Sequence, residues 1–213
     1  LHYPLRRQRQ MCIRDRVFEI AAPFNGEGKS LVKTINRFSG IDWGTESLAI
    51  AYDYWWDTRN RKAYAFNPSS PESKPKTIYD RNYQDVYNDP GSFLKSRNSF
   101  NRSVLQIYKG NAFLRGSGFT KEGQFPFIDK INTTSFEKTR VYQSKYTDKV
   151  ESIQDFDPVK NEIIVRIESP TEFPNYYSKK TNSRRLNQIT NFENPFLELQ
   201  NVKKEVISYK RDD

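Results

Sequence analysis

The sequence predicts an all-β protein, a partial β-propeller with about three four-stranded blades. Residues alternate between apolar and polar along most segments, which is typical of half-buried strands. Short apolar segments are separated by turns rich in Gly, Pro and Asn. The same order of four strands recurs three times, and the second strands are expected near Leu48, Val104 and Ile163, at spacings of 56 and 59 residues. Such a period suggests propeller blades, while a β-sandwich, which has similar strand and turn statistics, stays the alternative.

The first round contains the clearest strand pattern, over residues 47–56. A polar turn at 59–62 and a returning apolar segment at 63–66 predict a hairpin, and 77–79 adds a short strand. Alternation places Leu48, Ile50, Tyr52 and Tyr54 on one face and Ala49, Ala51, Asp53 and Trp55 on the other.

The later rounds repeat this organisation less clearly. Strands are expected at 93–94, 104–108, 125–131 and 139–142, and then at 150–156, 163–168, 176–177 and 186–190. Links such as 88–91 and 116–118 contain the Gly and Pro of turns. Because propellers have about 4–8 blades, three would leave the ring incomplete, with the missing blades upstream and an unpaired flank.

Length and composition fit one folded domain. The 213 residues are 35% hydrophobic and 15% aromatic, and such an aromatic content excludes disorder as the main state. No apolar run is long enough for a transmembrane helix. The formal charge of +9 would suit a polyanionic partner.

Residues 1–16 are interpreted as an artefact. The string from Arg6 to Arg16 resembles the translation of a transposase-type sequencing adapter, and residues 1–5 fit its index region. We therefore exclude the segment from fold reasoning. The alternative is a real basic N-terminal arm that binds nucleic acid.

Without residues 1–16, the net charge and the residue types available for catalysis change. Their exclusion removes five Arg and one Asp, so that 30 basic and 25 acidic residues remain and the charge falls to +5. The only histidine, methionine and cysteine are His2, Met11 and Cys12. Residues 17–213 therefore cannot assemble Ser-His-Asp or Cys-His catalysis, and a metal site would need oxygen ligands alone. No cofactor is expected.

Four sets of residues could form a functional site, and for each set a structural role is preferred over a functional one. The Gly116–Lys121 segment lacks the Walker spacing and is expected to be a turn. The acidic residues Asp85, Asp89, Asp155 and Asp157 are expected to cap turns rather than to form a glycosidase pair. The tryptophans Trp43, Trp55 and Trp56 are expected in the core or between blades.

The fourth set is basic. It comprises Lys179, Lys180, Arg184, Arg185, Lys203, Lys204, Lys210 and Arg211, with Tyr176, Tyr177 and Tyr209 nearby. Basic and aromatic residues together can bind single-stranded nucleic acid. The preferred interpretation is that these basic residues lie on a solvated strand face. A third interpretation is that one of the arginines binds an acidic side chain of a ligand.

Several motifs together carry a resemblance to a known family. They are Leu48–Tyr52 followed by Trp55 or Trp56, Thr58, Arg59 and Arg61; Asp85–Gly91; Gly116–Gly118 through Pro126–Asp129; Gln188–Phe192; and Lys204–Asp213. In order and spacing this set resembles the prolyl oligopeptidase family of serine peptidases, in its glutamyl endopeptidase branch. The resemblance covers residues 17–213.

The resemblance implies a two-part parent: a propeller that gates access for peptide substrates, then an α/β-hydrolase domain that cleaves after acidic residues. Residues 17–202 would be C-terminal blades, and 203–213 would begin the truncated hydrolase domain, with which the propeller makes contact. The catalytic Ser, Asp and His would lie beyond Asp213, so no catalytic, cofactor-binding or metal residue is assigned and the fragment itself is expected to be inactive.

The same resemblance favours an exported or periplasmic bacterial protein, with no nucleic-acid partner and no membrane span. The alternative is a non-enzymatic propeller module that binds a protein partner.

Overall fold

A computed structural model describes residues 15–199, 202 and 205–210, and in them the fold is all-β. No helix in this part of the chain is long and apolar enough to cross a membrane. The strands are β1 (Arg16–Glu19), β2 (Lys29–Lys33), β3 (Arg37–Thr45), β4 (Leu48–Trp55), β5 (Asn60–Phe66), β6 (Lys76–Asn82), β7 (Ser92–Phe93), β8 (Lys95–Arg97), β9 (Ser103–Leu105), β10 (Ile107–Tyr108), β11 (Asn111–Gly116), β12 (Phe127–Asn132), β13 (Lys138–Gln143), β14 (Val150–Asp157), β15 (Glu162–Glu168), β16 (Asn175–Lys180) and β17 (Asn187–Gln188), followed by the 3-10 turn η1 (Leu197–Leu199).

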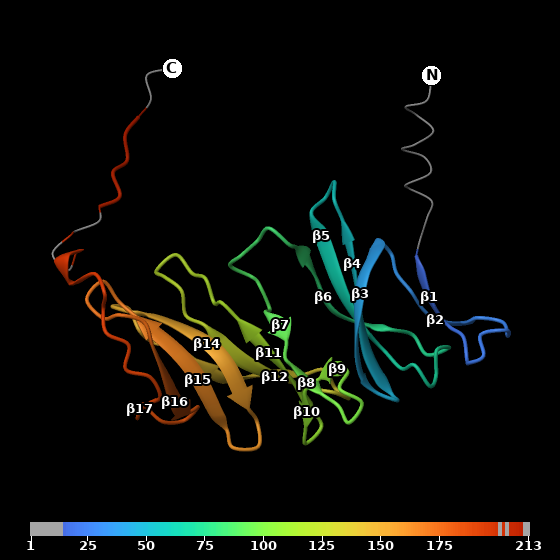
Figure 1. Cartoon of the computed structure of the whole chain (residues 1–213). Coiled ribbons are helices and arrows are strands. Elements are labelled where there is room, and N and C mark those ends of the chain that lie inside the picture. The colour runs from blue at the N-terminus through green and yellow to red at the C-terminus, as the bar shows by residue number, and fades with distance from the viewer. Residues whose placement is uncertain (1–14, 200–201, 203–204, 211–213) are drawn as a thin grey trace.

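Three antiparallel meanders follow one another along the chain and in space (Figure 1). The first sheet has the order β3-β4-β5-β6, the second β10-β11-β12-β13 with β7 also on β11, and the third β14-β15-β16-β17. Apart from β7, each strand of these sheets pairs with its neighbour in sequence, as in propeller blades. The predicted all-β, partial-propeller fold with three blades is therefore confirmed.

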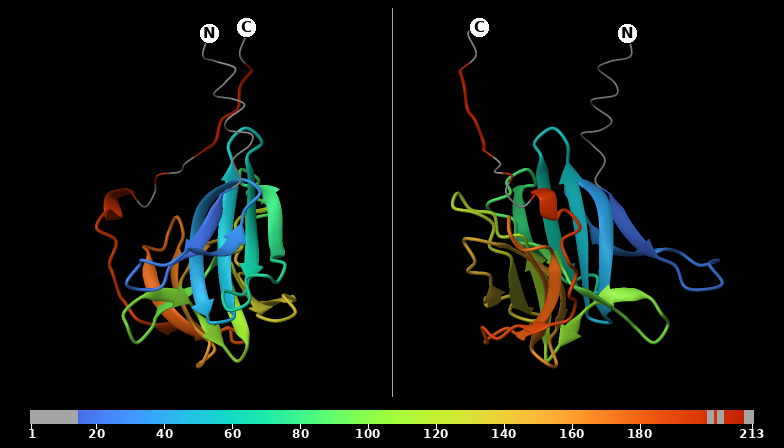
Figure 2. Two further views of the ribbon diagram at one scale, coloured as in Figure 1. Left: turned by 90° about the vertical axis from the view of Figure 1, so that its right-hand side faces the viewer. Right: turned by 60° about the vertical axis from the view of Figure 1, so that its left-hand side comes forward.

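The first strand position of the second sheet is divided between β7 and β10. Residues Ser92 and Phe93 pair with one end of β11, and Ile107 and Tyr108 pair with the other end. Between them the hairpin β8–β9 leaves the sheet and projects from the body of the molecule (Figure 2). The prediction that the second strand of this round begins near Val104 is therefore wrong. The apolar residues from 104 to 108 look like one strand in the sequence, but they divide between the hairpin and β10.

The residues of β4 alternate between two faces, as predicted, and the structure packs each face into a different core. Leu48 and Ile50 join the apolar cluster between the first and second sheets. Ala49 and Ala51 pack on the opposite face against Leu31 and other residues. Small side chains on this second face let β2 approach closely.

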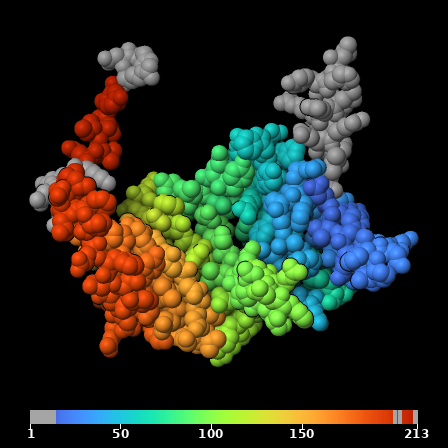
Figure 3. Space-filling model, viewed as in Figure 1, coloured from blue at the N-terminus to red at the C-terminus, as the bar shows by residue number. Residues whose placement is uncertain are grey.

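Apolar contacts join the sheets into one continuous body, which Figure 3 shows in space-filling form. The cluster between the first and second sheets is Leu48, Ile50, Ala63, Ala65, Phe93, Leu105, Ala112, Leu114 and Ile131. The cluster between the second and third sheets is Phe113, Ile128, Tyr142, Ile153, Phe156, Ile163, Val165 and Ile167. Consecutive residues of β11 therefore serve opposite interfaces, which is the period-2 rule of strands.

The pair β1–β2 covers the outer face of the first sheet through Leu31, Val32, Ala49, Ala51 and Phe66. The sequence analysis did not predict these strands. The segment between them, residues 20–28, contains a Pro and two Gly and breaks the alternation. The pair occupies the position that the outer strands of another sheet would take.

Domain boundaries were predicted between residues 16 and 17 and between residues 202 and 203, close to the two ends of the described chain. Residues 1–14 lie outside the described residues, but Asp15 is already part of the fold, since its carboxylate accepts a 2.8 Å hydrogen bond from Phe38 N. Residues 203, 204 and 211–213 also lie outside them. Residues 205–210 form no strand and are exposed. The domain division stays a prediction.

Candidate functional site

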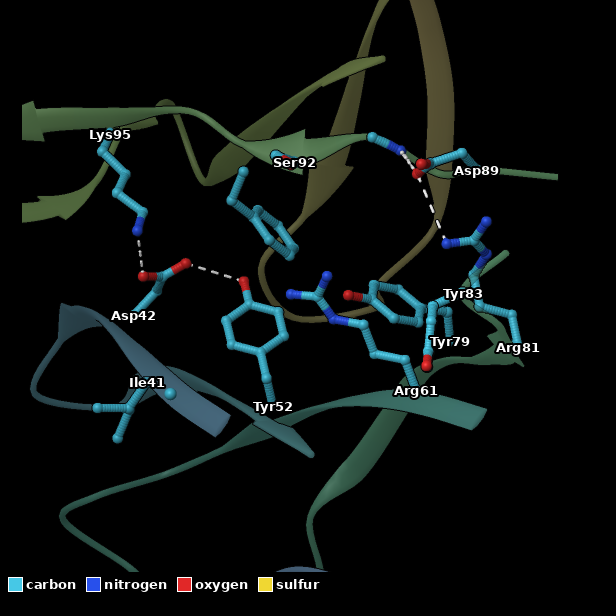
Figure 4. A pocket seen from close by; sticks show the side chains of 13 residues that line it. Ile41, Asp42, Tyr52, Arg61, Tyr79, Arg81, Tyr83, Asp89, Ser92 and Lys95 are labelled. Atoms are coloured by element: carbon cyan, nitrogen blue, oxygen red, sulfur yellow. Dashed lines mark hydrogen bonds and ion pairs between the residues drawn. The ribbon is translucent and has the colours of Figure 1, made fainter. Parts of the chain in front are cut away.

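A polar cleft of about 450 Å³ lies between the first and second sheets. Its walls come from β3, β4, β5 and β6 on one side and from the segment of residues 89–95 on the other. The volume is within the range of small-ligand pockets, about 300–1,000 Å³. Figure 4 shows the side chains that line it.

Strand register explains why these side chains share the cleft. Tyr52, Ala63 and Tyr79 stand opposite one another on β4, β5 and β6, and Arg61 stands opposite Arg81. Residues opposite each other or two apart lie on the same face of a sheet. Ala63 itself is fully buried in the apolar cluster, and the larger Tyr52 and Tyr79 on either side of it line the cleft.

One end of the cleft is closed by a paired acid. Lys95 of β8 lies with its Nζ 2.5 Å from Asp42 Oδ1, and the Tyr52 hydroxyl donates a 2.9 Å hydrogen bond to Asp42 Oδ2. Burial, and then the charge of Asp42, raise the pKa of Tyr52 far above its ordinary range. The hydroxyl therefore stays a donor at every physiological pH. These contacts also fix the base of the β8–β9 hairpin to the first sheet.

The other end is formed by Arg81 and the turn at 85–91. Arg81 Nη1 lies 3.8 Å from Asp89 Oδ1, and Arg81 Nη2 donates to the carbonyl of Asp85. Asp89 Oδ1 also accepts a 2.9 Å hydrogen bond from Gly91 N. Gly91 has φ +82°, and a Cβ there would meet the Arg115 carbonyl oxygen at 2.4 Å. Only glycine fits this close approach.

Between these two paired ends stands Arg61 (Figure 4). Its guanidinium lies 5.4 Å from the centroid of the Tyr52 ring, a cation–π contact. No carboxylate among the described residues lies within ion-pair distance of Arg61. Burial raises the pKa of the neighbouring Tyr79, so this side chain also remains a hydroxyl donor. The centre of the cleft therefore presents hydrogen-bond donors.

The hydrogen-bond donors at the centre of the cleft make it a candidate binding site. Within the described part of the chain there is no histidine or cysteine. No group of three metal-ligating side chains occurs among the residues searched.

The Gly116–Lys121 segment forms a turn, as predicted, and not a phosphate loop. Phe119 bridges to Gln124, and Thr120 N donates a 2.8 Å hydrogen bond to the Gly123 carbonyl. At Gly118, which has φ +63°, a Cβ would lie 1.9 Å from the Phe125 carbonyl oxygen. The glycine is therefore required by the chain itself.

Three of the four acidic candidates bond to turn amides, as predicted. Asp85 Oδ1 accepts from Tyr87 N at 3.1 Å, and a hydrogen bond from the Asn88 side chain to Asp85 lowers the pKa of this carboxylate. Asp157 accepts from the amides of Val159 and Lys160, at 2.9 and 3.0 Å, and these hydrogen bonds lower its pKa. The third is Asp89, described above. No hydrogen bond or ion pair of the Asp155 carboxylate occurs within the described ranges.

The basic candidates do not form one surface. Lys179 is buried, and its Nζ lies 2.8 Å from Glu151 Oε1, whereas Lys180 pairs with Glu162 at 2.9 Å. Arg184, Arg185 and Lys210 are exposed. Lys203, Lys204 and Arg211 lie outside the described residues. Tyr177 packs against the core between the second and third sheets, so it cannot be a stacking platform.

The tryptophan prediction is wrong for Trp56. This residue is 64% exposed at the tip of the β4–β5 hairpin, where the Arg59 guanidinium lies 3.9 Å from its ring centroid. Trp43 is 42% exposed and makes an edge contact with Phe66 at 6.5 Å, and Trp55 is half-buried. A hairpin tip extends past the neighbouring sheet, so no core forms around it.

Two buried polar clusters escaped the sequence analysis. The Asp53 carboxylate is fully buried and accepts hydrogen bonds from Ile35 N (3.1 Å), Asn36 N (2.9 Å), Asn36 Nδ2 (3.1 Å) and the Tyr64 hydroxyl (2.8 Å). In the second cluster the Tyr142 hydroxyl donates to Glu151 Oε2 at 2.6 Å beside Lys179. For Asp53 the available signal was an acid within an otherwise apolar strand, whereas β14 contains several polar residues and gave no such signal for Glu151.

Fold and cleft define the class as an all-β repeat protein of propeller type with a polar binding cleft between its first two sheets. No family model matches the sequence. The chain is 32% identical, over 94% of its length, to proteins of Arabidopsis thaliana and of Oryza sativa subsp. japonica, both described as probable chloroplastic glutamyl endopeptidases. Among solved structures it resembles TolB from Acinetobacter baumannii, with a TM-score of 0.39 and 11% identity over 82% of this chain and 37% of that one.

The chain therefore resembles one part of these glutamyl endopeptidases, and the resemblance extends over nearly all of its length. It spans 23% of the length of each plant relative.

Proposed function

We propose that this chain is the propeller portion of a prolyl oligopeptidase-type serine peptidase that cleaves peptides after acidic residues. The observation that carries the proposal is the 32% identity over 94% of the chain to glutamyl endopeptidases. The three consecutive meanders agree with it, because they have the strand order of propeller blades. Residues 17–202 would be blades, and residues 203–213 would lead into the hydrolase domain.

The role of the propeller would be steric. Propeller and hydrolase together would admit short or unfolded chains and exclude folded proteins, so that selection is by size and flexibility. In the hydrolase domain, a serine would attack the scissile carbonyl, a histidine would move the proton, and an aspartate would orient the imidazole. None of these groups is assigned to the residues of this chain.

The first test is a long-read sequence of the source DNA across both ends of the reading frame. The expected result is a frame that continues beyond Asp213 into a Gly-x-Ser-x-Gly elbow and a later histidine, with residues 1–16 absent from the genomic copy. A frame without the elbow would contradict the proposal and favour a non-enzymatic binding module.

The second test is enzymatic. The complete protein is expected to hydrolyse a Glu-containing reporter peptide, and the matched Gln peptide much more slowly. Replacement of the elbow serine by alanine should abolish this activity, while the 213-residue chain alone should show none. Turnover by the pure chain alone would contradict the assignment of catalysis to the hydrolase domain.

A further inference from the structure

We infer that the cleft between the first and second sheets binds a single carboxylate of an acidic peptide, and that Arg61 is its main ligand. The inference goes beyond the proposed function, which gives these sheets only a steric role. It concerns binding by this chain itself and holds whether or not the complete protein is a peptidase.

The first argument is the state of the acids in the cleft. Asp42 is paired with Lys95 and accepts a hydrogen bond from Tyr52, and Asp89 is paired with Arg81. Both carboxylates of the cleft thus already have cationic partners. Arg61 is the one cation of the lining without an acidic partner among the described residues.

The second argument is the charge balance of the walls. The charged residues that line the cleft are Asp42, Arg61, Arg81, Asp89 and Lys95, which gives three positive and two negative charges. The cleft is therefore short of one negative charge. A monoanion such as a carboxylate balances it, whereas a phosphate dianion would leave a net negative charge beside Asp42 and Asp89.

The third argument is the geometry of the donors. A guanidinium presents a planar fork of N–H groups that matches the two oxygens of a carboxylate. Arg61 is held against the Tyr52 ring at 5.4 Å, which restricts its rotamers before a ligand binds. In addition, Arg81 lines the same cleft and stands opposite Arg61 in the strand register. An oxyanion placed between the two guanidinium groups would be attracted by both.

The fourth argument is the size and the walls of the cleft. About 450 Å³ accommodates an acidic side chain with part of its backbone. Tyr79 and Tyr83 line the same space, and their rings offer flat apolar contact while their hydroxyls can donate. A peptide would use both properties, whereas a small inorganic ion would use only the donors.

The test uses the 213-residue chain and fluorescein-labelled Ac-Ala-Ala-Glu-Ala-Ala-amide, with the matched Gln peptide as comparison. Fluorescence anisotropy is expected to show binding of the Glu peptide that is at least about tenfold tighter than that of the Gln peptide. Arg61→Gln should remove this preference. Arg61→Lys, which keeps the charge but loses the fork, should lie between the two proteins.

The matched control is Arg102→Gln, which removes an exposed arginine of the β8–β9 hairpin outside the cleft. It should leave the affinity for the Glu peptide unchanged. If it weakens binding as much as Arg61→Gln does, attraction is by overall charge and the assignment of the cleft is wrong. Circular dichroism of each variant verifies folding, and Arg61→Lys serves if Arg61→Gln does not fold.

Two further outcomes would overturn the inference. One is equal affinity for the Glu and Gln peptides, which would mean that no carboxylate is recognised. The other is displacement of the peptide by inorganic phosphate at lower concentration than by acetate, which would identify a phosphate site. Loss of peptidase activity in the complete protein affects neither result, so failures of the two proposals can be distinguished.

Discussion

The two interfaces between consecutive sheets differ in the burial and the pairing of their charged residues. Between the second and third sheets, Glu151 and Lys179 are buried together, with side chains 0% and 6% exposed, inside an apolar cluster. Between the first and second sheets, the apolar cluster occupies only part of the interface and the polar cleft opens beside it. There Arg61 is exposed and lacks an acidic partner among the described residues.

The difference follows from the cost of burying charge. An ion withdrawn from water needs a partner, because an unpaired buried charge costs several kcal/mol. At an open cleft water solvates the guanidinium, so no partner is needed for stability. A charge that the fold does not need to neutralise is available for a ligand, and we expect the two interfaces to respond differently to substitution.

The largest expected effect is at the closed interface. Glu151→Ala leaves Lys179 buried without its carboxylate and removes the acceptor of the Tyr142 hydroxyl. We expect the free energy of unfolding to fall by about 3–5 kcal/mol, measured by urea denaturation. The double variant Glu151→Leu with Lys179→Met, which replaces both charges, should be far less destabilised. Equal losses in the two proteins would show that packing and not charge pairing decides this site.

An intermediate effect is expected at Tyr64. Its hydroxyl is one of four donors to the buried Asp53 carboxylate, and Tyr64→Phe removes it at almost constant shape. Hydrogen bonds to charged groups contribute about 1.5–3 kcal/mol, and the thermal midpoint should fall accordingly. Tyr54→Phe on the neighbouring strand β4, at a position 42% exposed, is the control and should change the thermal midpoint little. A small effect at both positions would mean that water replaces the lost donor.

A weaker effect on stability is expected at acidic pH. Hydrogen bonds from Lys62 and Asn60 lower the pKa of the exposed Asp80 in the folded protein. The folded state therefore favours the charged carboxylate. The stabilisation is present above the ordinary Asp pKa of about 3.9 and is lost as the pH falls through the lowered value. Asp80→Asn should reduce the slope of stability against pH below about pH 4, measured by urea denaturation over an acid series. An unchanged slope would assign the acid response to other carboxylates.

The smallest effect on stability is expected at the open cleft. Arg61 is exposed and its charge is solvated, so Arg61→Gln should change the free energy of unfolding by less than about 0.5 kcal/mol. The measurement is the same urea denaturation that is used for Glu151→Ala. A loss comparable to that of Glu151→Ala would show that the guanidinium supports the fold, and the contrast between the two interfaces would disappear.

Much of the fold could be predicted because strands obey a local rule. The alternation on β4 required only the order of apolar residues, and it placed Leu48 and Ile50 on one face and Ala49 and Ala51 on the other. The structure then packs the two faces into different cores. The four strands predicted for the third round correspond to β14–β17 for the same reason, whereas the first round was predicted without β3. The hairpin β8–β9 was missed because pairing partners, and not local pattern, decide which strand continues a sheet.

The candidate site was less predictable. The sequence analysis singled out basic clusters near the C-terminus, but the structure buries Lys179 and separates it from the exposed arginines. Arg61 was noted as part of a motif and was assigned to the polar turn at 59–62, which is wrong because β5 begins at Asn60. Its position opposite Arg81 depends on the register of β5 and β6, which are joined by nine residues of turn and loop between Phe66 and Lys76.

The sequence by itself determined the all-β class, the three rounds of strands, the lack of a histidine or cysteine in residues 17–213, and the resemblance to a peptidase family. The class, the rounds and the missing residue types follow from composition and periodicity, and the resemblance follows from the order of the motifs, all of which are properties of the chain alone. Only the tertiary structure decided which charges are paired. Asp42, Lys95, Arg81 and Asp89 come from separate strands and turns, and it is packing of the first sheet against the second that neutralises them and leaves Arg61 free.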